Sequence, residues 1–112
     1  MRIAVCSSDG ENVNLHFGKG TSLYIYDYDE KSEELEFIEQ RTVQIEEDKK
    51  EQSYLIIAAI KDCDVAICLE FGFKAQLRAK EENIKLVRED GTVKEAIEKY
   101  INHIKFMKNI KI

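Results

Sequence analysis

The sequence predicts a three-layer α/β/α protein. Its mixed five-stranded sheet has the order 3-2-1-4-5, with strand two antiparallel and helices on both faces. Three strand-like segments come first, helix-like and strand-like segments then alternate, and a capping motif with an apolar stripe marks a final helix. The 112 residues suit one domain, residues 1–112, built around one core.

Three strands are predicted in the first half of the chain. Residues 3–6 (IAVC) form a short apolar run bounded by SSDG, which is typical of a buried strand. Residues 23–29 (LYIYDYD) are aromatic and β-branched, and residues 34–43 (ELEFIEQRTV) alternate imperfectly between apolar and polar. Because only EKSE separates the second strand from the third, the two are predicted to form a hairpin.

Helix and strand alternate in the middle of the chain. The apolar block at residues 53–62 (SYLIIAAIKD) fits either state by periodicity, but its length and its two alanines favour a buried helix. The next strand, residues 65–69, leads to a helix in which Phe73 and Leu77 share one face. Asn83 stands where such a helix often ends in a left-handed residue.

A strand and a helix complete the pattern. Residues 84–89 (IKLVRE) predict the fifth strand, and Thr92 and Glu95 have the spacing of a capping box. The residues after them form an apolar stripe at helical spacing: Val93, Ala96, Ile97, Tyr100, Ile101 and Ile104. This stripe is predicted to be core.

The predicted topology restricts where a ligand can bind. Strands one, four and five are joined through helices, so they are predicted to be parallel with right-handed crossovers. The hairpin lies on one side of strand one and strand four on the other, which makes the end of strand one a switch point. Ligands of open α/β sheets favour the carboxyl ends of strands at such a point. Three segments should meet there: residues 6–8 with the loop around His16, residues 68–72, and residues 88–91.

Composition argues against several classes of partner. The chain has 17 basic and 22 acidic residues, a net charge of −5, and no basic stripe apart from its tail HIKFMKNIKI. Nucleic acid and anionic membrane surfaces are therefore not expected as partners. No apolar run reaches the roughly 18 residues of a membrane span, and the N-terminus lacks a signal-peptide layout. Three cysteines without close pairing suit the reducing cytoplasm.

The opening and later segments resemble one family. The opening MRIAVCSSDGENVNLHFGKGTSLYIYDYD combines a strand, Ser-Ser-Asp-Gly, a valine, His-Phe-Gly and an aromatic strand. The later stretch DCDVAICLEFGFKAQLRAKEENIKLVREDGTVKEAIEKY has an Asp-x-Asp strand, a glycine-started helix and a Gly-Thr-x-x-Glu-Ala helix. Together these motifs resemble the dinitrogenase iron–molybdenum cofactor biosynthesis family, which includes NifX-like proteins and the C-terminal part of NifB. The resemblance covers roughly residues 1–101.

The resemblance implies a fold and a function. It implies an RNase H-like fold that carries an iron–sulfur or iron–molybdenum cluster precursor without catalysing a reaction on it. The implied partners are cluster-donating and cluster-accepting proteins, and the chain would be a monomer or a weak homodimer. Two departures stand out. Residues 42–56 lack the cysteine and histidine that many relatives carry there, and Asn83 stands where a glycine is common.

The loop after the first strand supplies four predicted cofactor-binding residues. The His16 imidazole could bind iron or molybdenum, or donate a hydrogen bond to a cluster sulfide. The alternative is a loop histidine that only forms hydrogen bonds with the backbone. Its place at the switch point, together with the resemblance, favours the ligand role. Phe17 is predicted to wall the pocket or to be core, and Lys19 to attract an anion or to be only solvated. Gly18, with Gly20, is expected to adopt positive φ and to let a ligand approach closely, or only to form the turn.

The other predicted site residues come from the ends of the first and fourth strands. Gly72 opens a helix whose free amides, with Lys74 in the first turn, could receive an anionic cluster. Cys6 and Cys68 are candidate metal ligands beside His16, but both fit slightly better as small buried hydrophobes. Cys63 lies five positions before Cys68, an odd offset that predicts opposite faces and a poor chelating pair.

Two other classes of function remain open at this level. An RNase H-like nuclease would need clustered carboxylates for divalent metals, for which Asp9, Glu70 and Asp90 are the candidates. A Cys6–His16 nucleophile pair is formally available, without an evident third group to orient it. The chain could also be an interaction or regulatory module without a cluster.

Overall fold

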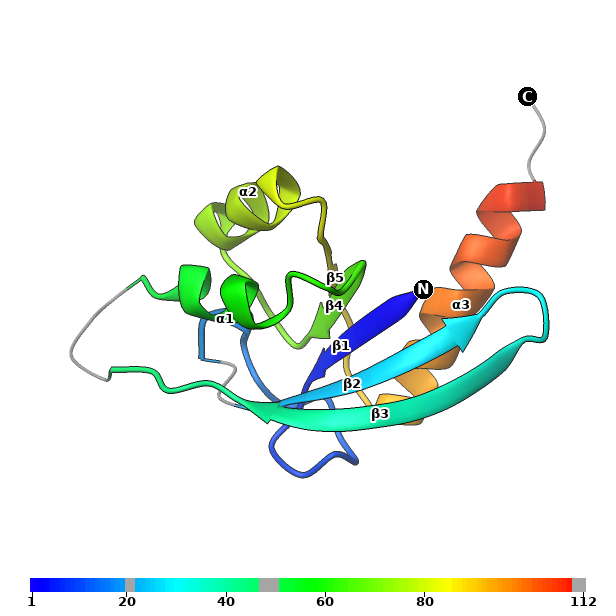
Figure 1. Ribbon diagram of the computed structural model, residues 1–112, viewed down its shortest axis with the longest axis horizontal. Helices are drawn as coiled ribbons and strands as arrows, with labels where there is room; N and C mark the ends of the chain where they lie inside the picture. Colours follow the sequence, from blue (N-terminus) through cyan, green and yellow to red (C-terminus); the bar gives the residue numbers. More distant parts are fainter. Residues whose placement is uncertain (20–21, 47–50, 110–112) are drawn as a thin grey trace.

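A mixed five-stranded sheet lies between helices on both of its faces (Figure 1). The structure is a computed structural model, and it describes residues 1–19, 22–46 and 51–109. Its strands are β1 (Arg2–Cys6), β2 (Ser22–Asp29), β3 (Glu34–Thr42), β4 (Val65–Cys68) and β5 (Lys85–Arg88). Their order is β3-β2-β1-β4-β5, which confirms the predicted order.

The pairing of the strands follows the predicted directions. β2 is antiparallel to both β1 and β3, whereas β4 is parallel to β1 and to β5. In the central pair, Ile3 of β1 is in register with Val65 of β4, and Val5 with Ile67. All four residues of β4 are buried, because a parallel strand covered by helices on both faces has no side that reaches water.

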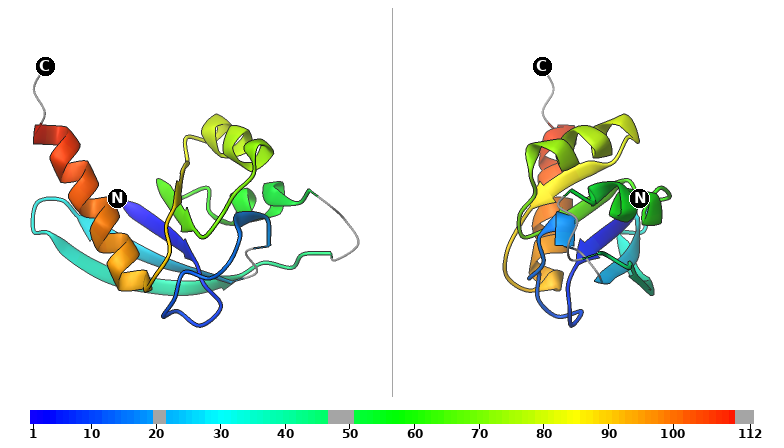
Figure 2. Two further views of the ribbon diagram at one scale, coloured as in Figure 1. Left: turned by 180° about the vertical axis from the view of Figure 1, so that it is seen from behind. Right: turned by 90° about the vertical axis from the view of Figure 1, so that its left-hand side faces the viewer.

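The helices divide the core in two. α1 (Ser53–Ala59) and α2 (Phe73–Glu81) cover one face, with the short 3₁₀ helix η1 (Phe17–Lys19), and α3 (Val93–Asn109) covers the other (Figure 2). The apolar block predicted at residues 53–62 therefore forms a helix, α1. The predicted stripe of α3 is also confirmed, since its first five residues are buried against the sheet.

Local signals in the sequence set two helix ends. The backbone N–H of Glu95 donates to Thr92 Oγ1 at 3.0 Å, and the Thr92 hydroxyl donates to Glu95 Oε1 at 2.8 Å, which confirms the capping box. Just beyond α2, Asn83 has φ 59°, the left-handed conformation that was predicted for it. Within the described residues, no helix is long and apolar enough to cross a membrane.

Candidate functional site

The loop after β1 returns to the sheet beside the end of β4. The backbone N–H of Leu69 donates to the Leu15 carbonyl at 3.0 Å, and that of Phe17 donates to the Glu70 carbonyl at 2.8 Å. His16 thereby pairs with Glu70 in a parallel bridge, so the loop extends the sheet by a short stretch. The two segments predicted to converge at the carboxyl end of β4 are hydrogen-bonded neighbours.

The end of β5 joins the same place. The backbone N–H of Glu89 donates to the Cys68 carbonyl at 3.0 Å. Arg88 Nε lies 2.5 Å from Glu70 Oε1, and the Arg88 guanidinium stands 4.7 Å from the centre of the Phe71 ring. The convergence of all three predicted segments is therefore confirmed, and Arg88 adds a cation that neutralises Glu70 beside His16.

The Ser-Ser-Asp-Gly segment forms its own turn. The buried Ser7 accepts a hydrogen bond from the Gly10 N–H at 2.9 Å and donates to Asp9 Oδ1 at 3.1 Å. The same Asp9 oxygen accepts the backbone N–H groups of Glu11 and Asn12, both at 2.9 Å. These bonds lower the pKa of Asp9 to about 2, the largest effect coming from the backbone of Asn12. The Asp9 carboxylate is thus occupied in holding the loop.

A glycine is required at one position of this loop, and it is Gly10. Its φ is 77°, and an added Cβ would lie 2.7 Å from the Tyr24 ring. The positive φ predicted for Gly18 is wrong, because Gly18 lies within η1 and the described glycines with positive φ are Gly10 and Gly91. Nothing lies within 4 Å of a Cβ added at Gly18, so open space adjoins it. Gly20 lies outside the described residues.

His16 and Phe17 have opposite environments. The Phe17 side chain is fully buried in the core beneath α1 and α2, whereas His16 is exposed at the surface. Phe17 anchors the loop and His16 is the residue that it presents to solvent. Lys19 follows on the same short helix, where its backbone N–H donates to the His16 carbonyl at 3.1 Å and its side chain is exposed.

The start of α2 follows closely after Glu70, the residue that pairs with His16. Gly72, two residues after Glu70, is the N-cap residue, and no side chain among the described residues caps this helix start. A Cβ added at Gly72 would meet nothing within 4 Å, and Lys74 in the first turn is exposed. Open space therefore adjoins the N-cap of α2.

The basic side chains near this helix start form few ion pairs with the described residues. Among the described residues, no ion pair involves His16, Lys19 or Lys74. The pKa of Glu51 is lowered mainly by the hydrogen bond from the Ser53 hydroxyl. The positive charges of Arg78 and Lys74 lower it further.

The cysteines lie inside the molecule. Cys6 and Cys68 have exposed fractions of 0% in the core beneath α1 and α2. A hydrogen bond with Cys68, and secondly burial, raise the pKa of Cys6 well above its ordinary value. Burial also raises the pKa of Cys63 to about 12. Cys63 belongs to the same core, so the predicted opposite faces are wrong, because Cys63 lies in the turn before β4 and not on the strand.

The donor atoms at this place suit one kind of ligand better than another. Across residues 1–19, 22–46 and 51–109, no three or more His, Cys, Asp or Glu side chains are grouped so that they could hold a metal ion. Asp9 and Glu70 are occupied by the turn and by Arg88. What the surface offers is one imidazole, uncapped helix amides and two ammonium groups, a set that suits an anionic ligand held by few contacts.

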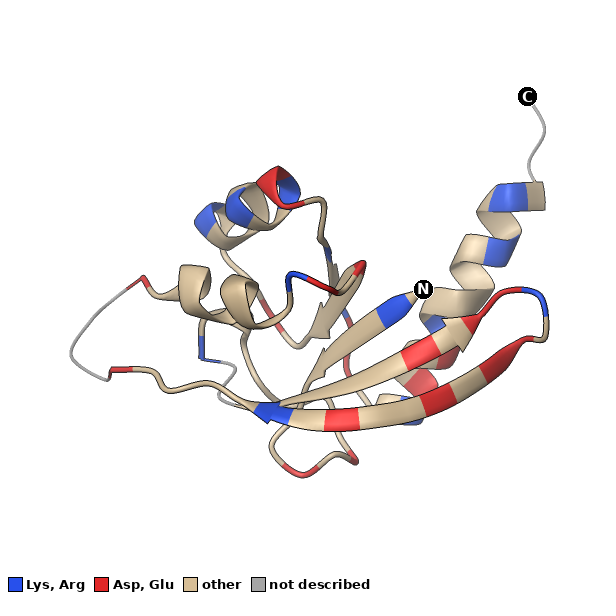
Figure 3. Ribbon diagram, viewed as in Figure 1, with Lys and Arg blue, Asp and Glu red and all other residues tan. Residues whose placement is uncertain are grey.

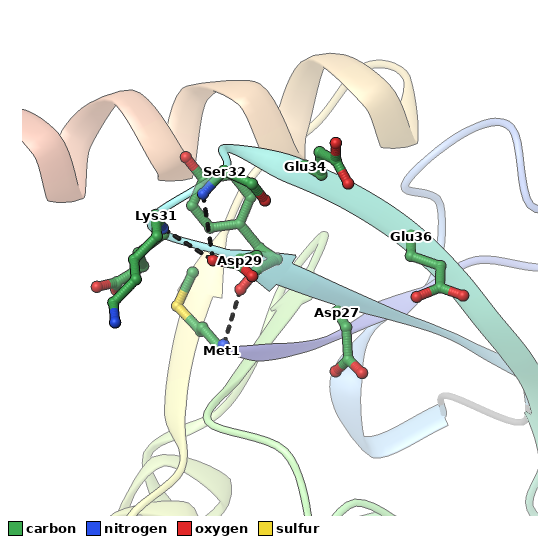
Figure 4. A pocket seen from close by; sticks show the side chains of 9 residues that line it. Met1, Asp27, Asp29, Lys31, Ser32, Glu34 and Glu36 are labelled. Atoms are coloured by element: carbon green, nitrogen blue, oxygen red, sulfur yellow. Dashed lines mark hydrogen bonds between the residues drawn. The ribbon is translucent and has the colours of Figure 1, made fainter.

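Negative charge is concentrated elsewhere (Figure 3). Acidic residues follow one another along β2, β3 and their connection, while α2 carries Lys74, Arg78 and Lys80. The hairpin end also borders a hollow of about 800 Å³ (Figure 4). Its acidic lining consists of Asp27, Asp29, Glu30, Glu34 and Glu36. An anionic ligand would be repelled there, so this hollow does not compete with the surface around His16.

Sequence reasoning placed Phe71 and Arg88 in the converging segments but gave no role to either side chain, and it gave none to Phe73 beyond its helix. Arg88 ends β5, so its place at the carboxyl end of a parallel strand was an available signal. Phe73 was assigned only to a helical face, and its side chain is 73% exposed, with Leu77 45% exposed one turn later. α2 packs on the sheet through Ala75 and Ala79 instead.

Comparison with known proteins gives one family and several similar folds. The family model described as "Dinitrogenase iron-molybdenum cofactor" matches residues 1–103. The crystal structure of the protein PH0822 is 20% identical, with a TM-score of 0.74 and 92% of each chain covered. A candidate NifB protein from Thermotoga is 24% identical, with a TM-score of 0.57, and the match covers 90% of this chain and 87% of that one.

A third solved structure and the search of curated proteins complete the comparison. A candidate dinitrogenase from Methanocaldococcus jannaschii is 14% identical, with a TM-score of 0.60, and the match covers 92% of this chain and 89% of that one. At these identities the solved structures support the fold alone. No curated protein matches the chain.

Proposed function

Because the chain belongs to the dinitrogenase iron-molybdenum cofactor family, we propose that it is a non-catalytic carrier of an iron–sulfur or iron–molybdenum cluster precursor. It would work in the cytoplasm as a monomer or weak homodimer, between cluster-donating and cluster-accepting proteins. The cluster is its cargo, received and passed on without a reaction. Its place is the surface at the carboxyl ends of β1 and β4.

One observation carries this proposal: the backbone pairing of His16 with Glu70. The pairing places the exposed imidazole beside the chain segment that leads into the uncapped start of α2. The buried Phe17 fixes the loop beneath it. An imidazole is a ligand for iron and for other transition metals, and helix amides bind anions.

Within the part of the chain that the structure describes, charge favours this surface for such cargo. A cluster precursor of this kind is anionic, and the protein carries a net charge of −5. The local field must therefore oppose the global one. Lys19, Lys74 and the amides of α2 supply positive potential, and Arg88 neutralises Glu70. A site with one metal-binding side chain holds its cargo moderately and can release it to a partner that offers more ligands.

The fully buried thiols contribute less to this proposal than His16 does. Metal ligation requires the thiolate, and burial together with the hydrogen bond to Cys68 disfavours the charged form of Cys6. Cys6 and Cys68 would become ligands only if the Phe17 loop opened. We therefore assign first contact with the cargo to His16.

The decisive experiment compares the two histidines of the chain. Anaerobic incubation with iron, sulfide and molybdate, followed by metal analysis and visible absorption, should show cluster uptake by the unaltered protein. His16→Ala should lose most of this uptake while keeping its circular dichroism spectrum. His103→Ala, which removes the exposed histidine of α3, should bind as the unaltered protein does. Equal uptake by both variants would return His16 to a structural role.

The competing enzyme reading is tested separately. A nuclease would need several free carboxylates at one place, yet Asp9 accepts bonds from its own turn and Glu70 pairs with Arg88. We expect no nuclease or hydrolase activity with magnesium or manganese. Reproducible metal-dependent cleavage that disappears in Asp9→Asn or Glu70→Gln would overturn the carrier and establish the enzyme.

An interaction module without cargo is the second candidate, and the exposed Phe73 and Leu77 of α2 favour it. Apolar side chains beside Lys74 and Arg78 suit contact with a protein that is itself apolar and acidic. The colour of the reconstituted protein distinguishes the two functions, because an iron–sulfur cluster absorbs visible light. A protein that stays colourless and metal-free after anaerobic reconstitution, although folded, would be the module.

A further inference from the structure

Two cysteines stand side by side at the ends of the central parallel strands. Cys6 is the last residue of β1 and Cys68 the last of β4. Val5 is in register with Ile67, so the next pair along the two strands is Cys6 with Cys68. Both side chains belong to the core beneath α1 and α2, and so they lie on the same face of the sheet.

The spacing of neighbouring strands suits a covalent link between these residues. Adjacent strands lie about 4.8 Å apart, and disulfides join residues whose Cα atoms are about 4.4–6.8 Å apart. We propose that Cys6 and Cys68 form a reversible disulfide between β1 and β4 when a hydroperoxide oxidises the protein. The pair is a modification site of its own, and it does not depend on cargo binding at His16.

The chemistry balances with one peroxide for each pair. The sulfur of one cysteine, as thiolate, attacks a peroxide oxygen; the O–O bond breaks, and the departing oxygen leaves as water, or as an alcohol from an organic hydroperoxide. The resulting sulfenic acid is attacked by the other sulfur, its S–O bond breaks, and a second water leaves with the remaining thiol proton. Two electrons pass from the sulfurs to the peroxide, and a dithiol reductant reverses the change.

The surroundings of the pair favour a neutral product. Both side chains are fully buried among apolar residues, with the Cys68 thiol also 3.8 Å from the Val87 carbonyl oxygen. A disulfide carries no charge, so it costs no burial of charge in this core. Within the described residues, no third metal-binding side chain is grouped with the two thiols. The pair therefore does not form a site for a metal that needs three or more protein ligands.

The packing around the pair, which includes the loop after β1, restricts access to it. The backbone bonds from Phe17 to Glu70 and from Leu69 to Leu15 hold the loop over the strand ends. A peroxide reaches these fully buried sulfurs only when the structure around them opens, so oxidation of the native protein should be slow. Once formed, the bond ties together the two strand ends from which residues 7–19 and 69–72 depart.

Cys63 is the matched control. It is buried as well, but its thiol lies 3.7 Å from Asp62 Oδ1 and it is not in register with a cysteine. Cleavage before aspartate residues separates all three cysteines, because the peptides 1–8, 62–63 and 64–89 each contain one. The position of a new disulfide can therefore be assigned in the unaltered protein.

The experiment treats the purified protein with hydrogen peroxide, alkylates the remaining thiols in denaturant and maps the peptides by mass spectrometry. We expect two of the three free thiols to disappear. Peptide 1–8 should be joined to 64–89, no disulfide-linked dimer should form, and dithiothreitol should restore both thiols. Cys63→Ala should give the same link. A link to Cys63, links only between molecules, or single cysteines oxidised to sulfinic acid without the 6–68 bond would overturn the proposal.

Discussion

The two ends of the central strands β1 and β4 differ in how far their charged side chains are paired. At the amino end, Arg2 Nε lies 2.8 Å from Asp27 and its Nη1 lies 2.8 Å from Asp62. Asp62 also accepts Arg41 Nη1 at 2.6 Å, so one carboxylate joins two arginines. At the carboxyl end, Arg88 pairs with Glu70, but no ion pair among the described residues engages His16 or Lys74.

This difference separates stability from function. Charges that are paired contribute to the folded state and leave little potential for a ligand. At the carboxyl end, the exposed Lys19 and Lys74 remain able to attract an anionic ligand. The buried Phe17 ring and backbone hydrogen bonds hold the loop there. Variants at the two ends should therefore fail in different ways.

The largest effect is expected at the carboxyl end, from Phe17→Ala. Removing a fully buried ring should lower the free energy of unfolding by about 3–5 kcal/mol. Phe73→Ala removes the same ring from an exposed position and should change it by less than about 0.5 kcal/mol. Urea unfolding followed by circular dichroism measures both. Similar losses in the two variants would contradict the division between anchor and surface.

The next effect is expected at the amino end, from Asp62→Asn. The side chain is 43% exposed, so solvent screens its two ion pairs, and we expect a loss of about 1 kcal/mol. Glu30→Gln is the control, because Glu30 has one exposed partner, Lys108, at 2.6 Å. It should cost less than Asp62→Asn in the same urea experiment. A loss at Glu30 equal to that at Asp62 would show that the network adds nothing to single pairs.

Acid should act on the paired carboxylates in a predictable direction. Hydrogen bonds from Arg41 hold the pKa of Asp62 well below its ordinary value of 3.8, and those from Arg2 likewise lower that of Asp27. The folded state then binds fewer protons than the unfolded one as the pH falls below that value. Stability is therefore fully present above it and declines as the pH falls toward the lower folded pKa. Asp62→Asn should make this decline shallower in unfolding curves taken between about pH 5 and pH 2.

The turn at the other end contributes to the same decline. Asp9 has a pKa of about 2, so its contribution should be lost between its ordinary 3.8 and about 2. Asp9→Asn should flatten the curve between about pH 4 and pH 2, and its effect should add to that of Asp62→Asn. If neither variant changes the slope, other carboxylates control the acid unfolding.

The smallest effect on stability, and a clear one on binding, is expected from Lys74→Glu. Lys74 is exposed, so the free energy of unfolding should change by less than about 0.5 kcal/mol. Uptake of the anionic cluster precursor should nevertheless weaken, most strongly at low ionic strength. Lys94→Glu makes the same change of charge on α3, across the sheet, and should bind nearly as the unaltered protein does. Equal weakening in both variants would mean that net charge, not the place of the charge, controls binding.

Much of the architecture was predictable because it depends on neighbours along the chain. Periodicity and length identified the strands and the final helix, and the Thr92–Glu95 spacing identified its start. The order 3-2-1-4-5 followed from short connections and the right-handed crossover rule, so the meeting of the His16 loop with residues 68–72 also followed. The residues proposed to bind cargo came from this reasoning and from the family resemblance, and their role stays a prediction.

What the sequence alone could not determine depends on residues far apart in the chain. Phe17 and Phe73 look alike in sequence, and only packing buries the first beneath α1 and α2 and leaves the second in solvent. Register placed Cys6 against Cys68, and the approach of distant segments made the Asp62 network and the Glu70–Arg88 pair. Local pattern determined the elements because hydrogen bonding and side-chain period are local. Burial and charge pairing were decided by the tertiary structure, because they depend on which elements come to lie side by side.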